Sequence, residues 1–273
     1  MKIALLLTGQ LRTYQMTKYL HMNSLISKYD TDIFLSIDLD NSKQVEHMNN
    51  KKKSTKAEAL SVVDFFNPID YYIMEDFDDE FNNIITKNMK IKNINQYKIL
   101  FEQYYIVKNA YKMLINHINL TNKEYDIIIR LRFDQILFTD ESNIVDKLNK
   151  TDKNEIIYSL ENIDLLKNLS VNYKITFEEI LENTIYLFGF GDYFHYKYAN
   201  DQFFYHNSKL INLIFMFYDN ILELVEYCLE NNIGNRGAIY ETIWYQFLIK
   251  NNIIIKKSNI KGSFIREFTS SKL

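Results

Sequence analysis

Two arginines and an aspartate alternate along one short segment, Arg130-Leu131-Arg132-Phe133-Asp134. Side chains alternate across a β-strand, so we expect Arg130, Arg132 and Asp134 on one face, with Leu131 and Phe133 anchored in the core. Charges at the end of a buried strand are costly unless they pair or bind a phosphate or a divalent metal. We therefore predict that a phosphate or a divalent metal completes this group, with Asp134 as the candidate metal ligand. A structural salt-bridge cluster at a sheet edge is the alternative.

A second candidate segment lies near the start of the chain, where residues 7–13 read Leu-Thr-Gly-Gln-Leu-Arg-Thr after an apolar run. In an open parallel sheet, ligands bind beyond the carboxyl ends of strands, where helix amino termini offer N–H groups to phosphate. The glycine would let backbone approach a ligand, and the arginine could pair with a diphosphate. The predicted nucleotide-sugar contacts here are Thr8, Gly9, Gln10 and Arg12. An ordinary strand-to-helix turn with a surface arginine is equally compatible with the pattern.

A third candidate is Asp38-Leu39-Asp40, which follows the apolar run 33–37. Spaced carboxylates of this kind can hold a metal against a diphosphate, but aspartates also cap turns at strand ends. Because the pair comes so early in the chain, we rank it below Asp134 as a metal site. Asp38 is instead predicted to contact the nucleoside.

A fourth candidate is Asn200-Asp201-Gln202-Phe203-Phe204, in which a carboxylate and an amide stand beside aromatic rings. These groups bind sugars through hydrogen bonds and ring stacking. We predict that Gln202 contacts the nucleotide sugar and that Asp201 is a general base for an acceptor hydroxyl. The alternative is an Asx cap that starts the next helix.

A glutamate interrupts an apolar helical stripe near the end of the chain. At helical spacing Glu241 shares a face with Trp244 and Leu248, so it is either partly buried with a partner or directed into a pocket. We predict Glu241 as the second candidate base or sugar contact. The histidines show no metal-binding spacing, and no serine or cysteine triad is recognisable.

These segments are set among elements that alternate along the chain. Six apolar runs read as buried strands of a mainly parallel sheet, namely Ile3–Leu7, Asp32–Ile37, Tyr71–Met74, Tyr125–Leu131, Glu155–Leu160 and Ile185–Phe188. Three stripes at 3.6-residue spacing read as helices, at 16–29, 100–118 and 210–228. Residues 162–183 read as an excursion from the sheet that is partly helical. The alternation predicts an α/β fold, a Rossmann-like sheet with helices on both faces, in one domain over residues 1–273.

Composition excludes several classes of protein. The chain has 273 residues, is 47% apolar and carries a net charge of −3, which rules out a disordered chain and a global basic field for nucleic acid. One cysteine, Cys228, cannot form an internal disulfide, and no apolar run approaches the length of a membrane span. We expect a cytoplasmic protein. The final Ser271-Lys272-Leu273 also matches a peroxisomal address, as an alternative.

Together the segments resemble the WavE-like lipopolysaccharide-synthesis proteins and related glycosyltransferases of giant viruses. The resemblance rests on the Gly9–Arg12 strand end, the helix from Gln103 to Leu114, the Arg130–Asp134 segment and the Asn200–Phe203 segment. A helix containing Glu241, the run 253–255 and Arg266 are similar to the family's ending. The resemblance implies a GT-A-like fold, a nucleotide-sugar donor and Mn²⁺ or Mg²⁺. It would place Asp134 at the metal, where many such enzymes carry two aspartates.

The sequence therefore predicts a glycosyltransferase of polysaccharide biosynthesis that moves a sugar from a UDP- or GDP-sugar to a glycan acceptor. Its metal or its arginines would stabilise the leaving diphosphate, and Asp201 or Glu241 would deprotonate the acceptor. A saccharide-binding or assembly protein without enzymatic activity is one alternative. Another Rossmann-type transferase, for a methyl or a sulfuryl group, is the other.

Overall fold

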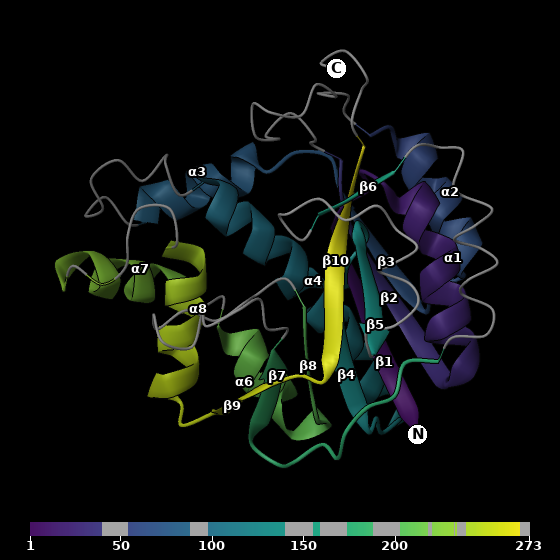
Figure 1. Cartoon of the computed structure of the whole chain (residues 1–273). Coiled ribbons are helices and arrows are strands. Elements are labelled where there is room, and N and C mark those ends of the chain that lie inside the picture. The colour runs from purple at the N-terminus through teal and green to yellow at the C-terminus, as the bar shows by residue number, and fades with distance from the viewer. Residues whose placement is uncertain are drawn as a thin grey trace.

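The structure is a computed structural model of the whole chain (Figure 1). It describes residues 1–39, 54–87, 98–139, 155–158, 174–187, 203–217, 220–231, 233 and 239–267. The strands are β1 Lys2–Gln10, β2 Asp30–Asp38, β3 Asp70–Met74, β4 Ile127–Arg132, β5 Gln135–Thr139, β6 Glu155–Tyr158, β7 Thr184–Leu187, β8 Phe204–His206, β9 Ile254–Lys257 and β10 Ile260–Glu267. The α-helices are α1 Tyr14–Ser24, α2 Lys56–Phe66, α3 Asp78–Lys87, α4 Lys98–Thr121, α6 Ile211–Met216, α7 Ile221–Glu230 and α8 Ile239–Lys250.

The main sheet has seven strands in the order β3-β2-β1-β4-β8-β7-β9. Strands β3, β2, β1 and β4 run parallel, β8 is antiparallel to both of its neighbours, and β7 is parallel to β9. The fold is therefore α/β with a mostly parallel sheet, as the alternation of elements predicts. All six predicted strands are present, within the residues that the structure describes.

Two apolar cores, one on each face of the sheet, explain why these strands are apolar throughout rather than alternating. Ala4, Leu6 and Ile128 face a core shared with α4, α6, α7 and α8. Ile3 and Leu5 face the opposite core, shared with α1 and α2. Figure 1 shows α1 and α2 on one side of the sheet and α4, α6 and α8 on the other. Helices on both faces are confirmed.

Helix α2 begins and ends where its sequence specifies. The hydroxyl of Thr55 accepts a hydrogen bond from the Glu58 amide, and the Glu58 carboxylate accepts one from the Thr55 amide, which forms a capping box. Asn67 ends the helix in the left-handed conformation at φ 45°.

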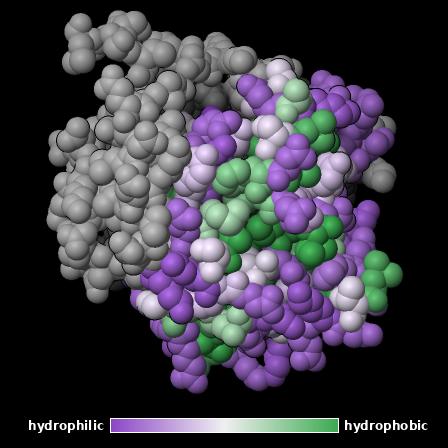
Figure 2. Space-filling view, turned by 90° about the vertical axis from the view of Figure 1, so that its right-hand side faces the viewer, coloured by the Kyte–Doolittle hydropathy of each residue, from purple (hydrophilic) through white to green (hydrophobic). Residues whose placement is uncertain are grey.

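Figure 2 shows the face of the molecule on the side of α1 and α2. Hydrophilic residues predominate on this face, and a patch of apolar residues lies near its middle.

Two predicted helices and the place of one predicted strand are corrected. The stripe at 16–29 ends as α1 at Ser24, because Tyr29 already has extended backbone at φ −138°. The stripe at 210–228 forms two helices, since the Asn220 amide bonds back to the carbonyls of Met216 and Phe217 before α7 starts. The predicted strand at 155–160 is present as β6, but it lies in a second, three-stranded sheet in the order β5-β10-β6 and not in the main sheet. Of the predicted excursion at 162–183, residues 174–183 contain no helix and residues 162–173 lie outside the described residues, so its partly helical character stays a prediction.

The strand order places a topological switch point between β1 and β4. From β1 the chain adds β2 and β3 on one side of the sheet and later adds β4 on the other. Ligands of open α/β sheets bind at such a point, beyond the carboxyl ends of the strands. Within the described residues, no helix has both the length and the apolar character needed to cross a membrane.

Candidate functional site

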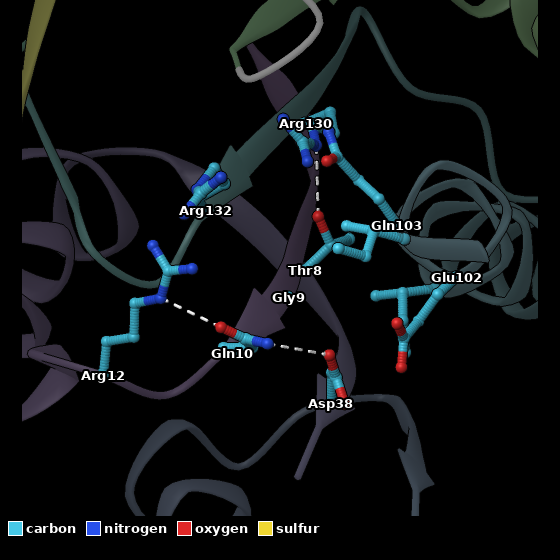
Figure 3. A pocket seen from close by; sticks show the side chains of 11 residues that line it. Thr8, Gly9, Gln10, Arg12, Asp38, Glu102, Gln103, Arg130 and Arg132 are labelled. Carbon is cyan, nitrogen blue, oxygen red and sulfur yellow. Dashed lines mark hydrogen bonds between the residues drawn. The ribbon is translucent and has the colours of Figure 1, made fainter. Parts of the chain in front are cut away.

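A pocket opens at this switch point, at the carboxyl ends of β1, β2 and β4 (Figure 3). It is open to solvent, and the free space within it and at its mouth amounts to about 560 Å³. Strand register explains its composition, because Thr8 lies opposite Arg132 and Gln10 lies opposite Asp38. Seven of the eight residues predicted to contact a nucleotide sugar line the pocket, namely Thr8, Gly9, Gln10, Arg12, Asp38, Arg130 and Arg132.

The end of β1 forms one wall of the pocket. Gly9 adopts φ +107°, a conformation that side chains strongly disfavour, and a Cβ placed there would meet no atom within 4 Å. The glycine is thus required by backbone conformation, and it leaves open space on the side where its side chain would be. Strand β1 continues to Gln10, three residues beyond the predicted strand end at Leu7, and the turn into α1 follows at Arg12 and Thr13. Among the described residues, the pocket lining includes Arg12 and no residue of α1.

Arg12, Asp134 and Arg132 form a connected ionic group. Arg132 donates from Nε to Asp134 Oδ1 at 2.8 Å and from Nη2 to Oδ2 at 2.9 Å. Arg12 donates from Nη1 to Asp134 Oδ2 at 3.2 Å. The side chains of Arg12 and Arg132 are 20% and 17% exposed, whereas that of Asp134 is 1% exposed. A buried carboxylate therefore holds two guanidinium groups that border the pocket.

Arg12 is also held from its other side. Its Nε donates to Gln10 Oε1 at 2.9 Å, and Gln10 Nε2 donates to Asp38 Oδ2 at 3.2 Å. Figure 3 shows these two bonds along the β1 wall of the pocket. Arg12 has φ +24°, a value that non-glycine residues rarely adopt and that is found preferentially at functional sites. One hydrogen-bonded chain thus joins the carboxyl ends of β2, β1 and β4.

Arg130 is the most deeply placed of the three arginines. It is 2% exposed, and its Nε donates to the Thr8 hydroxyl at 3.1 Å. Arg130 and Arg132 both line the pocket, so they lie on the same face of β4, as strand alternation predicts.

A neutral histidine lies close to the ionic group. Burial lowers the pKa of His21 to about 4, although a hydrogen bond to the Phe133 carbonyl and the charge of Asp134 act in the opposite direction. His21 is therefore uncharged at neutral pH, and it adds no positive charge to the two arginines that Asp134 holds.

The position of Asp134 differs from the prediction. Strand β4 ends at Arg132, and the chain turns at Phe133 and Asp134, so the alternation that would have carried Asp134 onto the face of the arginines stops one residue earlier. Both carboxylate oxygens accept hydrogen bonds from guanidinium groups, which would repel a cation at the same atoms. No group of three His, Cys, Asp or Glu side chains able to hold a metal occurs among the described residues. The surroundings of Asp134 do not fit the predicted Mn²⁺ or Mg²⁺.

Helix α4 supplies the wall that sequence reasoning missed. Ile99, Glu102, Gln103 and Ile106 line the pocket at the i, i+3, i+4, i+7 spacing of one helix face. Glu102 is 4% exposed. The available signal was a glutamate and a glutamine next to Leu100, Phe101 and Tyr104, in a helix otherwise predicted to pack on the core.

The remaining predicted residues are not brought to the pocket by the described structure. Asp201, Gln202 and the second aspartate of the early pair, Asp40, lie outside the described residues. Glu241 is on α8, half-buried, with Trp244 and Leu248 packed in the core as its stripe predicts. It is not among the residues that line the pocket.

Comparisons with known proteins carry no argument for the fold or the function of this chain. No protein-family model matches the chain, and no curated protein matches it, so the resemblance to the WavE-like proteins stays a prediction. The solved apo structure of mouse xyloside xylosyltransferase 1 is similar to the chain, with a TM-score of 0.37 at 10% identity. The alignment covers 94% of this chain and 84% of that chain. That protein is a glycosyltransferase by name, and at this level of likeness nothing about its substrates transfers to this chain.

Proposed function

We propose that this protein is a glycosyltransferase that takes a nucleotide-sugar donor into the pocket at the carboxyl ends of β1, β2 and β4. The observation that carries the proposal is the convergence of Arg12, Arg130 and Arg132 on one pocket at a switch point of the sheet. Guanidinium forks match the oxygens of a diphosphate and keep their charge at every physiological pH. The donor's diphosphate is assigned to the part of the pocket lined by these three arginines.

In the proposed reaction the acceptor oxygen forms a bond to the anomeric carbon of the donor sugar. The bond from that carbon to the phosphate oxygen breaks, the nucleoside diphosphate leaves with the electron pair, and the acceptor proton passes to a base. The residues described at the pocket serve the leaving group. Two arginines already oriented by Asp134 stabilise its developing charge without reorganising, which is the condition for effective electrostatic catalysis.

Asp134 is thus assigned a positioning role, in which its carboxylate holds Arg12 and Arg132 in place. The base is assigned to Asp201 or Glu241, as the sequence predicts. Asp201→Asn and Glu241→Gln test this assignment, because loss of a base lowers kcat while leaving donor affinity nearly unchanged.

A thermal-shift panel tests the proposed function against other transferases. It contains UDP-, GDP-, CMP- and dTDP-sugars, S-adenosylmethionine and a sulfonucleotide, each with EDTA or with Mn²⁺. A ligand at 100 times its Kd stabilises the folded state by about 2.7 kcal/mol, which raises Tm by roughly 5–10 °C in a protein of this size. Selective stabilisation by one family of nucleotide sugars supports the proposal. Stabilisation by S-adenosylmethionine or the sulfonucleotide alone would refute it.

A further inference from the structure

The pocket has two chemically different sides. Arg130 and Arg132 project from β4, and Figure 3 shows the carboxylates of Glu102 and Asp38 away from them, on the side formed by α4 and the end of β2. An ionised carboxylate only accepts hydrogen bonds, and it repels phosphate. A ligand with its diphosphate at the arginines must therefore present hydroxyl or N–H donors to the opposite side.

The burial of these carboxylates strengthens the requirement. Glu102 is 4% exposed and Asp38 is 6% exposed, yet both line the pocket. Both carboxylates already interact with groups of the protein, and an ionised carboxylate can accept about four hydrogen bonds, so a ligand donor can be added to those partners. Asp38 already accepts from Gln10, at Oδ2. A ligand hydroxyl would provide a further donor at the moment when a bound nucleotide displaces water from the pocket.

The place of Asp38 in the fold indicates which hydroxyls these are. It is the last residue of β2, the strand next to β1, and β1 ends in the positive-φ glycine Gly9. In dinucleotide-binding sheets, an acidic residue further along the chain from such a glycine binds the ribose hydroxyls of the nucleotide. Next to Glu102 on α4, Ile99 is 46% exposed at the pocket and offers an apolar surface to a nucleobase.

We propose that Glu102 is a specificity-determining residue whose carboxylate, together with Asp38, accepts hydrogen bonds from the donor's ribose and so selects ribonucleotides over deoxyribonucleotides. This inference rests on the proposed function and deepens it, because it excludes dTDP-sugars as donors. The hydroxyls of the transferred sugar are the other source of this chemistry, and the experiment separates the two.

The test is a binding cycle by isothermal titration with UDP, 2′-deoxy-UDP, 2′,3′-dideoxy-UDP, UDP-glucose and inorganic pyrophosphate, and with GDP and its dideoxy analogue. Weaker binding of 2′-deoxy-UDP than of UDP is the expected sign of selection for ribonucleotides, and equal binding of the two would overturn it. Wild type is compared with Glu102→Gln, which removes the charge and keeps the shape. A hydrogen bond to a charged group changes Kd by roughly tenfold to a hundredfold. Wild type is expected to bind the dideoxy analogue that much more weakly than its parent, and Glu102→Gln to narrow the difference to about threefold or less. Pyrophosphate, which has no ribose, should bind Glu102→Gln with an affinity equal to or tighter than its affinity for wild type.

Three results would overturn the inference. One is an equal ribose preference in both proteins, or none in wild type. Another is that Glu102→Gln instead weakens UDP-glucose relative to UDP, which would place the contact on the transferred sugar. A parallel loss of pyrophosphate and nucleotide binding would show a structural role. In these cases the proposed function stands if nucleotide still binds wild type, whereas binding of none of the probes to wild type would overturn both. Exposed Glu124→Gln is the control for charge, and Glu102→Asp replaces Glu102→Gln if that variant misfolds.

Discussion

Replacing Asp134 tests whether a buried carboxylate organises the arginine side of the pocket. Asp134→Ala removes the acceptor of three guanidinium hydrogen bonds and leaves Arg12 and Arg132 without the charge that orients them. Removing one partner of a fully buried ion pair costs about 3–5 kcal/mol. Because these arginines are 20% and 17% exposed and regain water, we expect a smaller cost than for a fully buried pair, about 2–3 kcal/mol.

That loss leaves the protein folded. Native domains are stable by about 5–15 kcal/mol, so Asp134→Ala should lower Tm by roughly 5–10 °C without unfolding the chain at 25 °C. Transfer should suffer far more, because the two guanidinium groups no longer meet the leaving diphosphate in a fixed geometry. We expect kcat/KM to fall at least about 100-fold, equivalent to about 2.7 kcal/mol of transition-state stabilisation.

Thermal denaturation followed by circular dichroism, together with initial rates of nucleoside diphosphate release, measures both effects. Asp134→Asn keeps the volume and removes the charge, and Asp126→Asn is the matched surface control, since the Asp126 side chain is 64% exposed. A folded Asp134→Asn variant with donor Kd and kcat/KM within about threefold of wild type would refute the positioning role. If Asp134 held a cation instead, Asp134→Asn would raise the Mn²⁺ concentration needed for half-maximal activity.

Further predictions concern backbone conformation and pH. Gly9→Ala should lower the free energy of unfolding by about 1–3 kcal/mol. The cost comes from the backbone φ of +107° alone, because the added Cβ meets no atom within 4 Å. The loss is measured as a lower urea midpoint, and an unchanged midpoint would contradict this reasoning. Burial lowers the pKa of His206 to about 4, with its Nδ1 donating to the Asn207 carbonyl and its Nε2 accepting from the Tyr111 hydroxyl. The unfolded chain binds this proton more tightly than the folded chain does. The contribution of His206 to the free energy of unfolding is therefore fully present above about pH 6.5 and falls by on the order of 3 kcal/mol toward pH 4. His206→Gln should flatten the pH dependence of urea unfolding between these values, and an unchanged slope would show that His206 does not titrate in this range.

Local physical rules explain why much of the fold was predictable. Strands buried on both faces are apolar throughout, and the runs at 3–7 and 32–37 lie inside β1 and β2. The run at 71–74 lies inside β3, an edge strand in which only Met74 is buried. The placement of Arg130 and Arg132 at one pocket follows from the two-residue period of β4, combined with the rule that ligands bind beyond the carboxyl ends of parallel strands.

The errors arise where local periodicity meets a chain reversal. Asp134 continues the alternation of Arg130 and Arg132 in sequence, but the chain turns after Arg132. The Asp134 carboxylate is buried, and both of its oxygens accept hydrogen bonds from guanidinium groups. The stripe at 210–228 keeps its helical period across the break between α6 and α7, so spacing alone could not locate that break.

Glu102 illustrates a different limit. Its burial depends on α4 packing beside the ends of β1 and β2, a tertiary arrangement that no short window of sequence contains. A carboxylate next to Phe101 and Tyr104 was a visible anomaly, yet only the pocket distinguishes a functional group from a structural one.

The central claim is that the pocket holds a nucleotide sugar for transfer, and the most direct measurement is product formation. Purified protein is incubated with the nucleotide sugar selected by the thermal-shift panel and a set of oligosaccharide acceptors, and the products are analysed by mass spectrometry. The account predicts release of the nucleoside diphosphate together with an acceptor that is heavier by one sugar residue, both lost in Arg132→Gln. Tight donor binding with neither product, across the acceptor set and with or without Mn²⁺, would contradict it and would indicate a saccharide-binding protein on the same scaffold.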